Sequence, residues 1–207
     1  MQEHASVTHG GQVVPVTPYR PLRGITLGIS EANFWAVLAG VVIVSVLAAL
    51  AATYLHMHNN TEMETVQSVI TTTQNELGTN GVYNYDGADD MTGTLAEAGG
   101  LPSNITVVGD KSSGSATLLN IWKGALTVEP VAGSDGSNTS FLVTEEEVPQ
   151  DACIQLSTGI SAAGLTSKVA VNGTETEGVL EKSDAASQCT EDDSGQGTNI
   201  LKFTVAG

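Results

Sequence analysis

The sequence predicts an α+β fold: a long N-terminal α-helix packed on a small antiparallel β-sheet, with a C-terminal region closed by a disulfide bond. Three observations lead to this prediction. No charged residue occurs from Ala32 to Leu55, and a helical pattern continues beyond that stretch. Short β-branched runs separated by turn residues begin after Asn104. Both cysteines of the chain, Cys153 and Cys189, lie in this second part.

The uncharged stretch predicts a membrane-inserted helix. Its 24 residues form a helix long enough, at ~1.5 Å per residue, to cross the ~30 Å hydrocarbon layer of a bilayer. Glu31 stands at its entrance. Arg20 and Arg23 flank its N-terminal end, whereas no cation follows it until Lys111. The positive-inside rule therefore predicts a cytoplasmic N-terminus and an exported C-terminal part.

The helical pattern continues after the apolar stretch as one apolar stripe on an otherwise polar surface. The stripe follows alternating steps of three and four residues: Met63, Val66, Ile70, Thr73 and Leu77. Gly78 and Asn80-Gly81 supply the stop. We therefore expect one helix from about Ile25 to Leu77, with an apolar half at 25–55 and an amphipathic half at 56–78. Residues 1–24 are expected to form a cytoplasmic leader, and residues 79–207 an exported head domain.

Within the head domain, turn signals separate the expected elements. The pattern predicts a short helix at 91–98 and a first strand at 105–108. A hairpin follows, in which strands 117–122 and 125–131 are joined by Lys123-Gly124. We then expect a strand at 140–143 and a helix that opens at Pro149 and ends at Gly159. The closing strands are expected at 168–171, 179–180 and 199–205.

The charge of the chain argues against nucleic-acid binding, and the missing motifs argue against an enzyme. Residues 56–207 contain five lysines and 21 acidic residues, and 5 − 21 = −16 is the whole net charge of the chain. A nucleic-acid-binding protein needs a basic face, so none is expected here. HExxH, GxSxG and Gly-rich phosphate-binding motifs are absent from the sequence. We therefore expect no enzyme, no cofactor and no metal site.

The two cysteines belong to the part of the chain predicted to be exported. In an oxidising compartment such a pair usually forms a disulfide bond. A bond between Cys153 and Cys189 would close a loop of 35 intervening residues. The alternative, a metal held by a lone cysteine pair with no histidine nearby, has less support.

Several local motifs then match a known family in order along the chain. Arg23-Gly24-Ile-Thr-Leu precedes the apolar helix, and Gly100-Leu-Pro closes the connector helix. The later motifs are Asn120-x-Trp122-x-Gly124-x-Leu-x-Val128, Phe141-x-Val143 leading to Asp-Ala-Cys153, Cys189, and Asn199-x-Leu-x-Phe203. From Arg23 to its end the chain resembles type IVb pilins, and it is especially similar to the major pilins of thin pili made by conjugative plasmids.

The resemblance implies a processing site and an assembly residue. In the family, a prepilin peptidase cuts after a glycine, and a glutamate is usually the fifth residue of the mature chain. Cleavage between Gly24 and Ile25 would make Glu31 the seventh residue, and cleavage between Gly28 and Ile29 would make it the third. The Arg23-Gly24 match favours Gly24. The family role of Glu31 would be to meet the N-terminal amine of a neighbouring subunit, and its alternative role is that of an interfacial residue that reaches water.

The function that the resemblance implies is that of a structural subunit of a pilus (fimbrium) for conjugation or cell adhesion. Its expected partners are copies of itself, the prepilin peptidase, the pilus assembly machinery and, before assembly, the inner membrane. The expected location is the inner membrane first and the extracellular pilus afterwards. Two alternatives remain open: a minor pilin or pseudopilin, and a secreted or membrane-anchored acidic binding domain cleaved by signal peptidase near Ala52.

Overall fold

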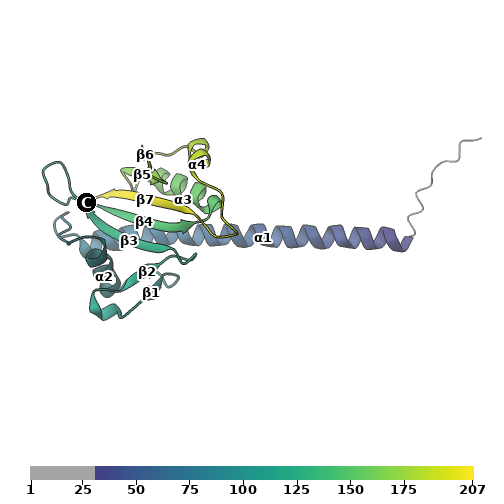
Figure 1. Ribbon diagram of the computed structural model, residues 1–207, viewed down its shortest axis with the longest axis horizontal. Helices are drawn as coiled ribbons and strands as arrows, with labels where there is room; N and C mark the ends of the chain where they lie inside the picture. The colour runs from purple at the N-terminus through teal and green to yellow at the C-terminus, as the bar shows by residue number, and fades with distance from the viewer. Residues whose placement is uncertain (1–30) are drawn as a thin grey trace, which may run out of the picture. The chain divides into compact units, whose positions relative to one another are not determined.

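The computed structural model describes residues 31–207 (Figure 1). The predicted leader and both predicted cleavage positions, Gly24-Ile25 and Gly28-Ile29, lie outside the described residues. The chain divides into two compact units, Met1–Leu47 and Ala48–Gly207.

The helical prediction holds for the described residues of both units. Helix α1 spans Glu31–Thr72 and is followed directly by the π-helical turn η1, Thr73–Leu77. The helix therefore ends at Leu77, as the Gly78 stop signal predicted, while the predicted start at Ile25 lies outside the described residues. Among the residues described, no helix combines the length and apolar character needed to cross a membrane.

A seven-stranded antiparallel sheet forms the body of the second unit. Its strands are β1 (Thr106–Val108), β2 (Thr117–Leu119), β3 (Ala125–Val131), β4 (Ser140–Val148), β5 (Lys168–Val171), β6 (Thr174–Glu177) and β7 (Asn199–Ala206). The spatial order is β1-β2-β3-β4-β7-β5-β6. The last strand of the chain thus lies in the middle of the sheet, between β4 and β5.

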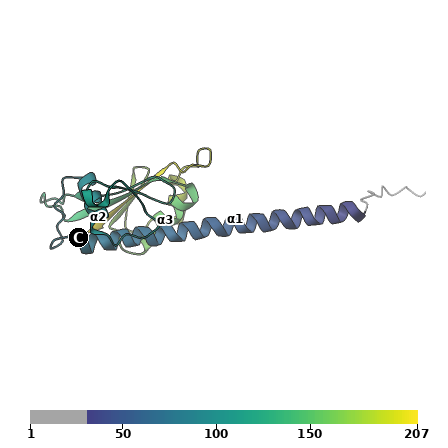
Figure 2. The same ribbon diagram turned by 90° about the horizontal axis from the view of Figure 1, so that it is seen from below.

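One face of this sheet is buried under helices. Along β7, Leu201, Phe203 and Val205 are buried, while Ile200, which precedes them, and Lys202, which lies between the first two, are exposed. The buried face is covered by the second half of α1, by α2 (Ala88–Ala98) and by α3 (Gln150–Ala162) (Figure 2). The predicted stripe of α1 enters this core, since Val66, Ile70, Thr73 and Leu77 are buried and Met63 packs at its border.

The structure corrects four of the predicted elements. The loop of the β2–β3 hairpin runs through residues 120–124, so β2 ends at Leu119 and the loop is longer than two residues. Strand β4 extends to Val148, with an irregularity in its pairing between Glu145 and Val148. Helix α3 continues past Gly159 to Ala162.

The fourth correction concerns residues 172–190. The predicted strand at 179–180 is wrong, because the partner of β5 is the polar strand β6, Thr174–Glu177. Leu180 is nevertheless buried, because it packs in the connection that follows, where its amide donates to Ser161 Oγ at 3.0 Å. A short helix that the sequence did not predict, α4 (Lys182–Gln188), ends immediately before Cys189.

Candidate functional site

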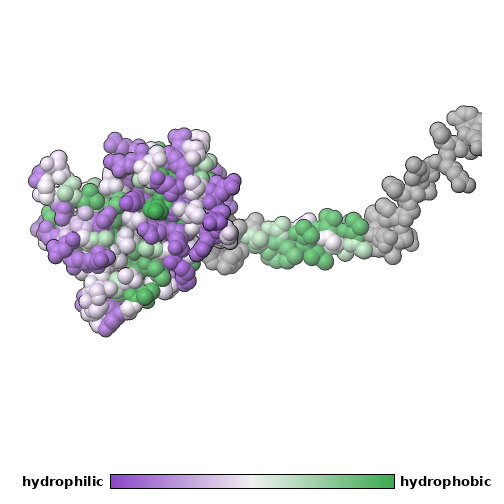
Figure 3. All heavy atoms as spheres, in the orientation of Figure 1, coloured by the Kyte–Doolittle hydropathy of each residue, from purple (hydrophilic) through white to green (hydrophobic). Residues whose placement is uncertain are grey.

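An exposed apolar surface covers the described part of the first half of α1. It is made by nine side chains that are 44–67% exposed: Val37, Leu38, Val41, Val42, Ile43, Val44, Val46, Leu47 and Leu50. Figure 3 shows this segment mainly in green, whereas the face of the second unit seen in that view is a mixture of purple and white with scattered green. We call residues 37–50 the apolar segment. Soluble monomers rarely expose a contiguous apolar patch of this kind, which usually marks contact with another protein or with lipid.

The polar groups of the apolar segment are satisfied within the helix. Ser45 Oγ donates to the carbonyl oxygen of Val41 at 2.7 Å. A hydroxyl that bonds to its own helix in this way needs no further partner in an apolar environment. The segment can therefore be buried against lipid or other helices without leaving this hydroxyl unpaired.

For the predicted assembly residue, the structure describes the backbone and not the side chain. Glu31 is the first residue of α1, and its side chain lies outside the described ones. The roles predicted for Glu31 and for the two candidate cleavage positions therefore remain predictions.

The predicted disulfide bond is present. Cys153 of α3 is bonded to Cys189, and their Cα atoms are 6.0 Å apart. Both residues are buried. The bond joins α3 to the end of α4, and Gln150 Nε2 donates to the Cys189 carbonyl at 3.3 Å beside it. This junction fixes the region of the chain that precedes β7.

A buried asparagine holds the start of β7. Asn199 Nδ2 donates to the carbonyl oxygens of Val148 and Thr190, both at 3.0 Å. Its Oδ1 accepts from the Thr190 amide at 2.7 Å and from Asn172 Nδ2 at 2.8 Å. One side chain thus joins β4, the segment after Cys189, and the β5–β6 turn.

A second buried asparagine organises the irregular part of β4. Asn120 Nδ2 donates to Glu145 Oε2 and to the Glu146 carbonyl, both at 2.8 Å. Its Oδ1 accepts from the amides of Trp122 and Gly124 at 3.0 and 2.9 Å. Gly124 has no room for a side chain here, because a Cβ would lie 1.9 Å from the Glu146 carbonyl oxygen.

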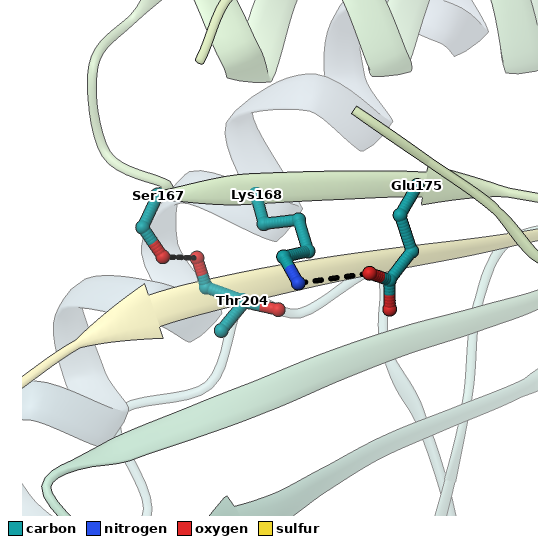
Figure 4. Close-up of polar contacts among 4 residues, drawn as sticks. All are labelled: Ser167, Lys168, Glu175 and Thr204. Atoms are coloured by element: carbon teal, nitrogen blue, oxygen red, sulfur yellow. Dashed lines mark hydrogen bonds and ion pairs between the residues drawn. The ribbon is translucent and has the colours of Figure 1, made fainter. Parts of the chain in front are cut away.

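Charged side chains occupy one edge of the sheet. Strand β6, at one edge, carries Glu175 and Glu177, and charged residues on an edge strand discourage pairing with another chain. Lys168 Nζ of β5 pairs with Glu175 Oε2 at 2.8 Å, and Ser167 Oγ donates to the Thr204 carbonyl at 3.2 Å (Figure 4). The Glu175 carboxylate raises the pKa of Lys168. Since both partners are substantially exposed, this pair adds little stability.

Where β3 continues past the start of β2, a side chain of α2 takes the place of a strand partner. Thr92 Oγ1 of α2 donates to the Val128 carbonyl at 3.1 Å and accepts from the Val128 amide at 2.9 Å. Gly93 of α2 packs against the loop before β2, because a Cβ there would lie 1.9 Å from the Gly114 carbonyl oxygen. Helix α2 is therefore fixed to β3.

A hollow of about 520 Å³ lies beside this contact, between α2 and strands β2 and β3. Hydroxyl and aliphatic side chains line most of it, and Asp89 is its one charged lining residue. No group of three or more His, Cys, Asp or Glu side chains that could bind a metal ion occurs in the part of the chain that the structure describes.

Sequence reasoning missed one unusual feature of the core. Glu62 of α1 and Glu145 of β4 are both completely buried. Glu62 stands four residues before Val66, so the stripe that predicted the buried face of α1 could have included it. Glu145 alternates with Phe141 and Val143 on β4, which could have indicated that it faces inward.

Comparison with known proteins identifies the family. The family described as PilS N terminal matches residues 56–206. The crystal structure of a type IVb pilin from Salmonella typhi is similar at 40% sequence identity, covers 72% of this chain and 99% of its own, and superposes with a TM-score of 0.63.

Two further comparisons complete the picture. The NMR structure of the type IVb pilin PilS from Salmonella typhi is similar at 37% identity, covers 72% of this chain and 96% of its own, and has a TM-score of 0.49. No curated protein sequence gave a significant match. From the family match and the 40% identity to a solved pilin, we conclude that the chain belongs to the PilS family of type IVb pilins.

Proposed function

We propose that this chain is the repeating structural subunit of a type IVb pilus. The observation that carries the proposal is the 40% identity over 99% of a solved type IVb pilin. The apolar segment supports it, since a helix with exposed apolar side chains on several faces suits a bundle of helices from many subunits. The proposed role is structural and involves no enzymatic activity.

The proposed life cycle begins in the inner membrane, with the N-terminus in the cytoplasm. A prepilin peptidase removes the leader after Gly24, or alternatively after Gly28. The pilus assembly machinery then adds the subunit to a filament through its N-terminal helix, and Glu31 meets the N-terminal amine of a neighbouring subunit. The completed pilus is extracellular and serves conjugation or adhesion, as in the thin pili of conjugative plasmids.

The test is N-terminal sequencing of filaments sheared from cells that express the chain with its assembly machinery. The proposal predicts that the chain dominates the sheared fraction and begins at Ile25 or Ile29. A mature chain that begins near residue 52 and appears in the soluble periplasm would instead identify a secreted binding domain. A chain that begins at Ile25 but is a trace component of the filaments would identify a minor pilin.

A further inference from the structure

Two carboxyl groups lie buried where α1 meets the sheet. Glu62 belongs to α1 and Glu145 to β4, and both are 0% exposed. Among the described residues, three of their four carboxyl oxygens have no hydrogen-bond partner: Glu62 Oε1, Glu62 Oε2 and Glu145 Oε1. The fourth, Glu145 Oε2, accepts from Asn120 Nδ2 at 2.8 Å. An ionised carboxylate removed from water requires several donors or a cation, and this site offers only the side-chain amide of Asn120 and the backbone amide of Ile121 to the two groups.

Among the side chains that the structure describes, none packed around the pair supplies a compensating charge. On the sheet, the pairing partners of Glu145 are Leu126 of β3 and Leu201 of β7, and both are buried and apolar. The hairpin loop contributes Asn120 and the backbone amide of Ile121. On α1 itself, the nearest acid, Glu64, is exposed.

The cations of the described chain are engaged elsewhere or exposed. Lys168 pairs with Glu175, and Lys123 Nζ donates to Thr106 Oγ1 at 3.3 Å. Lys202 lies on the outer face of β7. His58 stands four residues before Glu62 in α1, at the spacing of helix neighbours, and its side chain lies outside the described ones. A variant of His58 is therefore a necessary control.

The surroundings raise the pKa of both carboxyl groups. Burial raises the pKa of Glu62 to about 7, and the Ile121 amide and the Glu145 carboxyl oppose this only in part. Burial also raises the pKa of Glu145 well above its ordinary value, and the neighbouring charge of Glu62 adds to the rise while Asn120 opposes it. Two groups that interact this strongly titrate as a pair.

We propose that Glu62 and Glu145 retain at least one shared proton at neutral pH, and that this proton makes the contact between α1 and the sheet a pH-sensitive joint. With the proton present, one carboxyl can donate to the other, and one negative charge at most is buried. When both groups are ionised, two carboxylates repel each other in a site with one donor side chain. The packing of α1 on β4 then weakens.

The direction of the pH effect follows from the two states. In the unfolded chain both groups have the ordinary glutamate value near 4.5, and in the folded chain the pKa of Glu62 is about 7 and that of Glu145 is also raised. At a pH between these two values, folding is therefore accompanied by the uptake of a proton. The contribution of Glu62 to stability is complete below about pH 4.5 and is lost as the pH rises through about 7, and the contribution of Glu145 is lost as the pH rises through its own raised pKa. Each proton taken up changes the unfolding equilibrium constant about tenfold per pH unit.

The experiment measures denaturant unfolding of the full-length chain in detergent at several pH values from about 5 to 8. The wild-type chain should lose stability as the pH rises. The double variant Glu62→Gln/Glu145→Gln keeps the shape of both side chains and removes the titration. Between pH 5 and 7, the unfolding constant of the wild-type chain should therefore change with each pH unit by about ten times as large a factor as that of the double variant.

Two matched variants separate the pair from other titrating groups. Glu64→Gln removes one exposed charge from the same helix, and His58→Gln removes the histidine nearest to Glu62 in the sequence. Both should keep the wild-type pH dependence. A double variant with the wild-type slope, or a His58→Gln variant that alone loses it, would overturn the proposal.

A second measurement covers the case in which the double variant does not fold. Infrared spectroscopy of the wild-type chain at pH 7 should detect the carbonyl stretch of a protonated carboxyl group, shifted by labelling glutamate with carbon-13. The band should disappear as the pH is raised above the pKa of the pair. Absence of a glutamic acid band at pH 7 would refute the shared proton regardless of how the variants behave.

Discussion

The replacement of Asn199 by aspartate tests how the head domain is held together. The change is nearly isosteric, and it leaves an acceptor for the Thr190 amide and for Asn172 Nδ2. It removes the two N–H donors that point at the carbonyl oxygens of Val148 and Thr190, each at 3.0 Å. In their place a carboxylate oxygen would face both carbonyls in a buried position.

The cost can be worked from these contacts. Two lost hydrogen bonds cost about 1 kcal/mol each, and an uncompensated buried charge adds about 1–3 kcal/mol more. The sum, roughly 3–5 kcal/mol, is a large part of the 5–15 kcal/mol that stabilises a typical domain. For a domain of this size, it corresponds to a fall in Tm on the order of 10 °C.

The assay is thermal unfolding of the full-length chain followed by circular dichroism. Asn84→Asp is the matched control, because Asn84 is exposed and its replacement adds the same negative charge. The control should change Tm by no more than about 1–2 °C. Lowering the pH should restore part of the stability of Asn199→Asp, since a protonated carboxyl regains one donor. If Asn199→Asp has the same Tm as the control, the asparagine does not hold β7 through these hydrogen bonds.

Three further predictions concern processing, the disulfide bond and assembly. Gly24→Ala should leave the full-length chain in the inner membrane, detected by mass spectrometry, and maturation of this variant alongside failure of Gly28→Ala would move the processing site to Gly28. Cys153→Ser should cost about 4 kcal/mol, by the chain-entropy model for a sequence separation of 36 residues, and should lower the level of pilin by exposing it to periplasmic proteases. Wild-type levels and protease resistance would contradict that estimate. Glu31→Gln should be cleaved and inserted normally and yet give few sheared pili, because the proposed pairing with a neighbouring N-terminal amine is lost. Normal piliation would leave Glu31 as an interfacial residue.

The parts of the fold that could be predicted from the sequence are those with a strong local signal. The stripe through Val66 and Ile70 predicted which face of α1 is buried, because apolar residues that recur at helical spacing over several turns indicate a helix with one buried face. The last strand was predicted at 199–205, and the alternation of buried and exposed residues along β7 is that of a strand with one buried face. The disulfide bond followed from the count of cysteines and the predicted export.

The elements that were missed depend on tertiary contacts rather than on local pattern. Strand β6 is polar throughout, since an edge strand with exposed side chains needs no apolar face. Helix α4 has seven residues, too few to be stable in isolation, and it ends at a cysteine bonded to α3. Val179-Leu180 carried the apolar signal of a strand, but Leu180 fills the core from a connection that has no strand partner.

The motif residues behind the family resemblance acquire a physical explanation. Asn120 and Gly124 belong to the loop that holds the irregular segment of β4, and Asn199 joins β4 to β7 and to the region after the disulfide. These residues specify the folded head domain. The resemblance therefore supports the fold through its later motifs, whereas the proposals on processing and assembly rest on Gly24, Glu31 and the apolar segment.

The buried glutamates show the limit of pattern reasoning in the core. A carboxyl group on an apolar stripe is ordinarily taken as an interruption, because burying its ionised form costs several kcal/mol. Two such groups on different elements relieve that cost only if they meet, and their meeting depends on the packing of α1 against β4. Neither Glu62 nor Glu145 predicts the other from the sequence, since 83 positions separate them. Their pairing is a property of the tertiary structure, and for that reason its pH dependence reports directly on the contact between helix and sheet.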